Sequence, residues 1–227
     1  MKNAKKNAVA AGILYIIAAV ASISGLALYD PILKSQNYII SDGLFNNQIY
    51  WGAFLEIITT FSVIGITISL FPILKKVNLT LSIGHVCFRL LEATIILIGT
   101  LCVISVVSLN QEYIKEVNPN RENYLMAYKI LIELKNWTFL FGPNLILAPS
   151  TIITGYLLYK SNLVPKVISI LGIIGGLLIF ISGLFVIFGL YEQISVWGIV
   201  CAIPVFFFEM SLALWLIFKG VTESIQQ

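Results

Sequence analysis

The chain has 227 residues, of which 59% are hydrophobic and only 11% are charged, whereas about a quarter of the residues in a soluble domain carry a charge. The charges fall in short gaps between long apolar runs, which is typical of a protein that crosses a membrane several times. The net charge of +3, without a basic patch, excludes a nucleic-acid partner. The sequence therefore predicts an all-α integral membrane protein embedded in a lipid bilayer.

Six apolar runs each reach the roughly 20 residues that a helix needs to cross the hydrocarbon layer. Helices are expected because unpaired backbone groups are too costly in lipid. The predicted spans are residues 8–28, 49–74, 80–107, 137–159, 164–190 and 196–218. The first span is longer than the apolar part of a cleaved signal peptide, so we interpret it as retained. The whole chain, 1–227, is interpreted as one transmembrane domain, a six-helix bundle.

Between the third and fourth spans, the sequence predicts a polar outer loop at residues 108–136. Asn118 and Pro119 are typical of the start of a helix, with Asn118 as the cap and Pro119 in the first turn. The loop is therefore expected to contain a helix that lies at the membrane surface or extends the fourth span. A docking face for a protein partner is the alternative.

The lysines predict the orientation of the bundle. One side of the membrane receives Lys2, Lys5, Lys6, Lys75, Lys76, Lys160, Lys166 and Lys219. Basic residues on the other side lie in longer loops and are mixed with acidic ones. The positive-inside rule then places both termini in the cytoplasm. Trp51, Trp137 and Trp197 fall at outer helix ends, as expected of an aromatic belt.

A polar stripe interrupts the third span. His85, Arg89 and Glu92 are spaced i, i+4 and i+7, so they share one narrow face of a helix. Ionisable residues inside a membrane normally face the interior of a bundle or a watery cavity, and they are candidates for a functional site. The other polar candidates within spans are Glu56, Asn144 and Glu209.

The rise of 1.5 Å per residue predicts two polar layers. Arg89, Glu92 and Glu209 lie roughly 13, 18 and 14 Å from the cytoplasmic side, and His85 is a further candidate for this layer. Glu56 and Asn144 lie roughly 27 and 24 Å from that side, in the outer half. Arg89 is expected to pair with Glu209 across the bundle while Glu92, one turn along the same helix, shares its guanidinium group.

Three glutamates face a single arginine in these layers. Uncompensated buried carboxylates take up protons, unless a cation or a water-filled cavity supports them. One hypothesis is a transport-like or small-ligand-binding protein, with a cytoplasm-facing cavity around Arg89, Glu92 and Glu209 that binds a small polar ligand or protons. A second is a structural or regulatory partner protein whose buried charges only fix helix packing. The excess of carboxylates over the arginine favours the first.

An intramembrane enzyme is the third hypothesis, and it has the least support. The spans hold one histidine and no aspartate, and the three cysteines have no metal-binding spacing, so neither a metal site nor a cofactor is predicted. Nucleotide-binding glycine motifs and the nucleophile motif of hydrolases are missing from the sequence. A Ser–His pair that uses Ser82 or Ser211 stays open. His85 is more consistent with a hydrogen-bonded interior residue than with a metal ligand.

Several stretches resemble the bacterial membrane proteins of domain-of-unknown-function family 4386. They are AGILY at 11–15, FRLLEATIILIG at 88–99, GYLLYKSNLVPK at 155–166 and PVFFFEMSLALWLIFKG at 204–220. The resemblance covers nearly the whole chain and includes Arg89, Glu92 and Glu209. It implies a six-helix protein of the bacterial cytoplasmic membrane, and it implies no particular activity. The segment 108–136 is longer and more polar than the family pattern.

Overall fold

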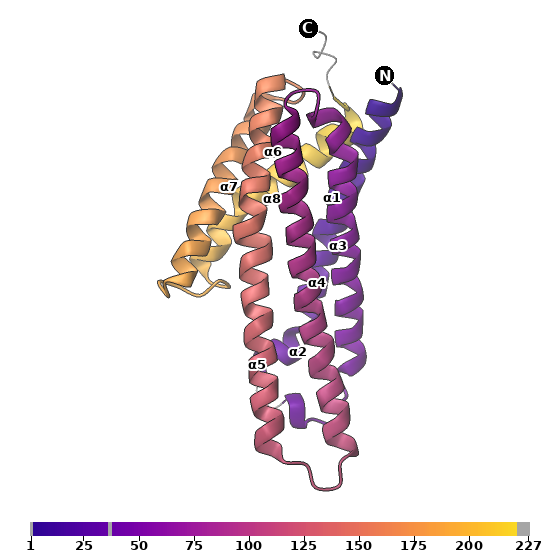
Figure 1. The fold of residues 1–227 in the computed structure, drawn as a ribbon, viewed down its shortest axis with the longest axis vertical. Helices are drawn as coiled ribbons and strands as arrows, with labels where there is room; N and C mark the ends of the chain where they lie inside the picture. Colours follow the sequence, from indigo (N-terminus) through magenta and orange to yellow (C-terminus); the bar gives the residue numbers. More distant parts are fainter. Residues whose placement is uncertain (1, 36–37, 222–227) are drawn as a thin grey trace.

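The structure is a computed structural model that describes residues 2–35 and 38–221, and this part of the chain is helical without any strand. Figure 1 shows the helices in chain order. Their bounds are α1 Lys2–Leu28, α2 Asp30–Lys34, the 3-10 helix η1 Tyr38–Ile40, α3 Asn46–Leu74, α4 Leu79–Lys115, α5 Arg121–Leu140, the π-helix η2 Phe141–Ile146, α6 Leu147–Ser161, α7 Lys166–Ile187 and α8 Val196–Phe218.

Six helices of the described chain are long and apolar enough to cross a membrane, which confirms the predicted all-α, six-span architecture. They are Ala4–Leu28, Asn46–Leu74, Leu79–Lys115, Arg121–Ser161, Lys166–Ile187 and Val196–Phe218. The fourth is one continuous rod because α5, η2 and α6 follow one another without a break. The first and last described residues, Lys2 and Val221, lie at the same end of the bundle, called here the terminal end; the opposite one is the distal end (Figure 1).

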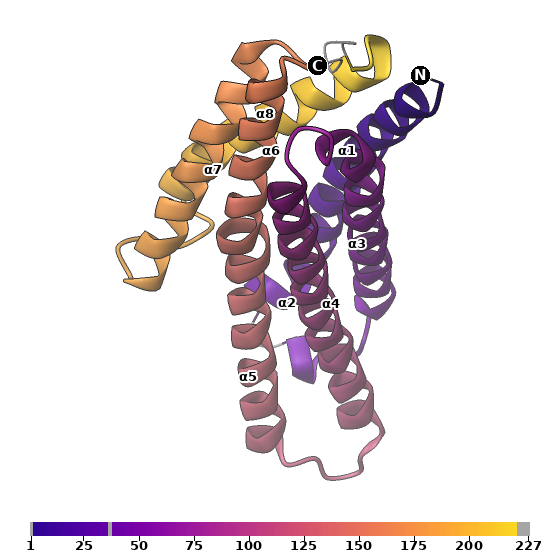
Figure 2. The ribbon, with the colours of Figure 1, turned by 45° about the horizontal axis from the view of Figure 1, so that its top comes forward.

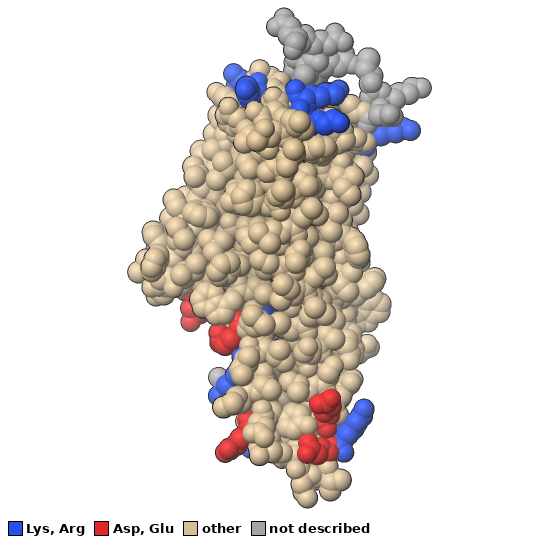
Figure 3. All heavy atoms as spheres, viewed as in Figure 1, with Lys and Arg blue, Asp and Glu red and all other residues tan. Residues whose placement is uncertain are grey.

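The spans form a closed ring. Contacts run from α1 to α3, α4, α6, α7, α8 and back to α1, while α5 packs against α4. Figure 2 shows α4 and α5 side by side and reaching further toward the distal end than α7 and α8. In the view of Figure 3, the charged side chains of described residues at the terminal end are basic, those at the distal end have both signs, and the described surface between them is free of charge. This uncharged zone matches the hydrocarbon layer of a bilayer.

The predicted polar loop at 108–136 is wrong, because most of it is helical. Helix α4 continues to Lys115 and α5 begins at Arg121, so only residues 116–120 connect them. The cap of α5 is Asn120, whose side chain accepts a hydrogen bond from the Asn123 N–H, and not Asn118. Pro119 precedes the helix instead of lying in its first turn. Of the two predicted forms, the extension of the fourth span is the one present.

Tertiary contacts explain why this polar segment is helical. Helices α2 and η1 bring Tyr38 and Ile39 against Val106 and Tyr128, in a distal core shared by α3, α4 and α5. Asn110 ties the same elements together, since its side-chain amide donates to the backbone carbonyls of residues 38, 39 and 41. The apolar faces of α4 and α5 are therefore buried by a part of the chain that lies 70 to 90 residues away, as the Asn110 and Tyr128 hydrogen bonds show.

A second core closes the terminal end. It combines Ala8 and Ala11 of α1 with Leu70 of α3, Leu157 of α6 and Leu212 of α8, all of them almost fully buried. Small residues allow these helices to approach closely, as is usual in membranes. The two cores lie at opposite ends of the bundle, and the buried charges lie between them.

Gly12 makes the α1–α8 contact possible. A methyl group at this position would lie 2.6 Å from the Ala213 carbonyl oxygen, which is backbone and cannot turn away. We expect Gly12→Ala to lower the free energy of unfolding by about 1–3 kcal/mol, because the two helices must separate. Gly84→Ala is the control, since its new methyl group meets only Ile153 at 3.5 Å. The free energy of unfolding of both variants in detergent tests this prediction. Equal losses from Gly12→Ala and Gly84→Ala would contradict it.

Candidate functional site

The predicted stripe of α4 is buried inside the bundle. His85, Arg89 and Glu92 are all at most 4% exposed. Arg89 Nη1 donates to Glu92 Oε2 over 3.1 Å, and Arg89 Nη2 donates to Glu209 Oε1 of α8 over 2.8 Å. These are the contacts that helix depth and charge predicted. Arg89, Glu92 and Glu209 are called here the Arg89 cluster, and it joins two spans 120 residues apart.

A second buried ion pair lies toward the distal end. Lys135 Nζ of α5 donates to Glu56 Oε1 of α3 over 2.7 Å, and both side chains are at most 10% exposed. The hydroxyls of Thr100 and Tyr29 donate to the other carboxylate oxygen of Glu56, over 2.7 and 3.2 Å. These four residues are called the Glu56 cluster. Both oxygens of this carboxylate therefore accept hydrogen bonds from protein groups, one on Oε1 and two on Oε2.

Sequence reasoning missed Lys135, because it assigned this residue to the polar loop. One signal could have found it. Glu56 lies inside a span without a cation on its own helix, and a buried carboxylate needs a partner from elsewhere in the chain. Lys135 is two residues from Trp137, at the predicted start of the fourth span, and its long aliphatic stem can reach inward. The ammonium Nζ also lies over the rings of Tyr29 and Phe139, 5.3 and 5.7 Å from their centroids.

Asn144 was predicted to share the outer polar layer with Glu56. Asn144 lies in the π-helix η2, and its Cβ is 3.7 Å from where a Cβ of Gly183 in α7 would be. The wider turn of a π-helix changes which residues of the rod face the interior, and no sequence pattern marks that change. Lys135 is the residue that pairs with Glu56, and Asn144 is not among the residues that line the cavity between the clusters.

His85 is separate from the hydrogen bonds of the Arg89 cluster. Its Nδ1 atom lies 2.9 Å from the hydroxyls of Ser150 and Thr154 in α6. Ser82 and Ser211, the serines considered for a Ser–His pair, bond to backbone carbonyls of their own helices instead. The pair that does form, His85 with Ser150, is fully buried, so a substrate has no access to it. His85 is a hydrogen-bonded interior residue.

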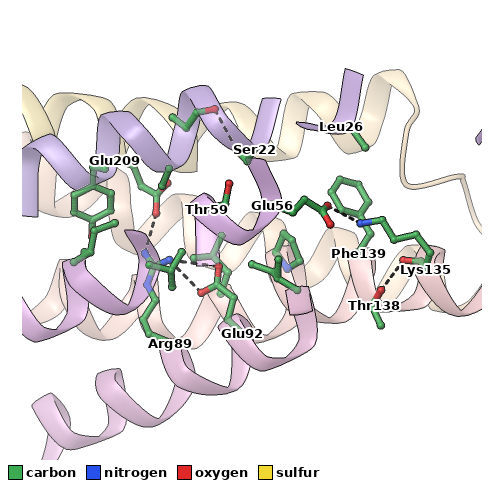
Figure 4. Close-up of a pocket in the computed structure, with 18 residues that line it drawn as sticks. Ser22, Leu26, Glu56, Thr59, Arg89, Glu92, Lys135, Thr138, Phe139 and Glu209 are labelled. Atoms are coloured by element: carbon green, nitrogen blue, oxygen red, sulfur yellow. Dashed lines mark hydrogen bonds and ion pairs between the residues drawn. The ribbon is translucent and has the colours of Figure 1, made fainter. Parts of the chain in front are cut away.

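A cavity of about 150 Å³ connects the two clusters. Figure 4 shows Arg89, Glu92 and Glu209 at one end of it, Glu56 and Lys135 at the other, and Thr59 between them. The walls between the clusters are apolar and include Ala18, Ala19, Val63, Ile96 and Leu147. On the other side of the Arg89 cluster, the terminal core fills the bundle. The expected cavity facing the terminal end is therefore wrong, and the cavity extends from Arg89 toward the distal end.

The reason for this correction is the distribution of side-chain volume. At the terminal end, Phe208, Leu212 and Leu216 of α8 fill the space between α1, α3 and α6. Beyond Glu209, the wall that α1 presents to the interior contains the small residues Ala18, Ala19 and Ser22, which leave the space open. Groups of three or more histidine, cysteine or acidic residues that could hold a metal are not found among the described residues.

Comparison with known proteins gives one match. Residues 10–220 match the family described as domain of unknown function (DUF4386). No curated protein and no solved structure matches the chain. The match includes every residue of both clusters.

Proposed function

The chain belongs to the DUF4386 family, whose description assigns no activity, and we propose that this protein binds a small polar ligand inside the membrane bundle. The observation that carries the proposal is the cavity that reaches both buried ion-pair clusters. Ligand sites are typically concave, mostly apolar and furnished with a few converging polar groups, and this cavity has that composition. Intramembrane charges that line a cavity are usually functional.

The competing explanation is that the charges only fix helix packing. A network with that role alone would be expected to leave no open volume beside its charged groups. The Arg89 cluster instead borders open volume, and 22% of the Glu209 side chain is exposed. This exposure supports a ligand site at Glu209.

We further propose that the ligand enters from the distal half and that the protein acts in a transport-like way. The terminal core blocks the other direction in this conformation. If the lysine distribution sets the orientation, with both termini in the cytoplasm of a bacterial cell, the cavity faces the outer half of the cytoplasmic membrane. Pro204 inside α8 and the π-helix η2, whose Pro143 lines the cavity, are candidate hinges, because prolines and π-turns are common sites of helix kinks.

Access to the cavity can be measured by cysteine labelling. In a background without Cys87, Cys102 and Cys201, we expect Thr59→Cys to react with the small neutral reagent methyl methanethiosulfonate. Thr59 lines the cavity. Ser62→Cys is the matched control, because Ser62 is a buried small polar residue one turn further along α3 that does not line it. A rate at least tenfold higher at position 59 is expected, whereas equal rates would contradict the proposal.

A further inference from the structure

We propose that the ligand is a small linear organic monocation, such as a primary alkylammonium ion, bound by the free carboxylate oxygen of Glu209. This inference rests on the proposed function above and specifies the ligand class of the same cavity. It is carried by three observations on the residues that line the cavity: their net charge, their free hydrogen-bonding atoms and the shape of the space.

The charges that line the cavity do not balance. Three carboxylates, Glu56, Glu92 and Glu209, face two cations, Arg89 and Lys135. Glu56 and Lys135 neutralise each other through a direct ion pair. Arg89 is shared between two glutamates, which leaves one negative charge when all groups are ionised. Because an unpaired charge is unfavourable in a membrane interior, a bound monocation would restore neutrality.

The free carboxylate oxygen belongs to Glu209. Both oxygens of Glu92 face Arg89 Nη1, at 3.1 and 3.5 Å. Glu209 uses only Oε1 for Arg89, and no described residue donates a hydrogen bond to its Oε2. The partial exposure of this side chain into the cavity makes Oε2 accessible to a ligand. The negative charge and the open acceptor therefore coincide at one atom.

Arg89 Nε is a free donor at the cavity, whereas the hydroxyls of three other lining residues offer lone pairs. The Tyr15 hydroxyl lines the cavity, is part of a side chain only 2% exposed and has no hydrogen-bond partner. The Thr59 hydroxyl donates its proton to the Leu55 carbonyl and offers a ligand only its lone pairs. The Ser22 hydroxyl likewise donates its proton to the Ala19 carbonyl and offers a ligand only its lone pairs. An ammonium group has three donors and no acceptor, so it can donate to Glu209 Oε2 and to these hydroxyl lone pairs.

The space between the clusters favours a chain over a ring. On α1, the lining residues extend from Tyr15 to Leu26, which corresponds to about 16 Å along the helix. The cavity, of about 150 Å³, is therefore an elongated slot, with apolar walls at Ala18, Val63 and Ile96. This slot is too small for a phospholipid. A free amine with a short alkyl chain would place its ammonium group at Glu209 and its chain along these walls.

The proposal is tested by the thermal stability of the purified full-length protein in detergent. The probes are n-butylammonium, n-butanol and butyrate, which share a chain and differ in charge. Binding to the folded protein raises Tm, by about 5–10 °C at a hundredfold excess over Kd. We expect a saturable rise in Tm with n-butylammonium and with neither of the other probes. The rise should be lost in Glu209→Gln and retained in Glu112→Gln, a control at an exposed glutamate of α4. Thr59→Val leaves both ion pairs intact, and we expect it to weaken binding several-fold.

Each other outcome has a definite meaning. A rise with butyrate or butanol alone, or an n-butylammonium effect that persists in Glu209→Gln, would overturn the ligand class. No rise with any of the three, combined with fast labelling of Thr59→Cys, would also overturn it and leave the proposed cavity function standing. If labelling is absent as well, the proposed function itself is wrong. Thr59→Val keeps the test available if Glu209→Gln does not fold.

Discussion

Arg89→Gln is expected to be the most destabilising single substitution in the bundle, lowering the free energy of unfolding by about 3–5 kcal/mol. The guanidinium group is 3% exposed and pairs with Glu92 and Glu209. Its removal leaves two carboxylates close together without a cation, in a place that water hardly reaches. Unfolding of the purified protein in mixed micelles measures this loss. The control Arg121→Gln, at the exposed start of α5, is expected to change the free energy of unfolding little.

The partner substitution Glu209→Gln is expected to behave differently. Glu92 still neutralises Arg89, and one unbalanced negative charge disappears, so the loss should be below about 1 kcal/mol. The double variant should recover part of the Arg89→Gln loss, with a coupling energy of about 0.5–3 kcal/mol. Equal, large losses from both single substitutions would instead indicate a purely structural pair, and the excess carboxylate would then have no separate role.

Lys135→Met is expected to cost about 3 kcal/mol or more, because it leaves Glu56 as an unpaired buried carboxylate. Methionine keeps much of the aliphatic stem, so the loss reports mainly on the ammonium group, which pairs with Glu56 and lies over the rings of Tyr29 and Phe139. Stability in detergent is again the measurement. Lys129→Met on the same helix is the control, since Lys129 is exposed.

The double variant Lys135→Met with Glu56→Gln distinguishes pairing from packing. If the ion pair is responsible, this variant should be more stable than Lys135→Met alone, because no unpaired charge remains. If it is as unstable as the single variant, the stem of Lys135 stabilises the fold by packing and its charge does not matter.

The sequence predicted the polar contact between α4 and α8 because depth and charge are both readable from it. A helix rises by a fixed amount per residue, so Arg89 and Glu209 must lie at similar depths once their helices cross the same bilayer. A lone buried arginine also needs a carboxylate within reach. With one arginine inside the spans, few partners were available, and the structure has Glu209 at 2.8 Å and Glu92 at 3.1 Å.

The Glu56–Lys135 pair could not be derived in this way, because Lys135 falls in a segment whose helicity depends on distant contacts. Residues 121–136 have mixed polarity, and their apolar face is buried only where α2 and η1 pack against α5 through Tyr128 and its neighbours. The π-helix at Phe141–Ile146 then turned Asn144 toward α7. Both effects are tertiary, and neither leaves a pattern in the sequence.

Composition and periodicity by themselves determined that this is a six-span helical membrane protein with an arginine–glutamate cluster inside it, since both follow from transfer free energies and helix geometry that act residue by residue. Only the tertiary structure decided where open space remains. The large side chains of α8 fill the terminal end, and the alanines of α1 leave a cavity beyond Glu209. A cavity is the volume that several helices together fail to fill, so it depends on their mutual tilt and packing and cannot be assigned to any single stretch of sequence.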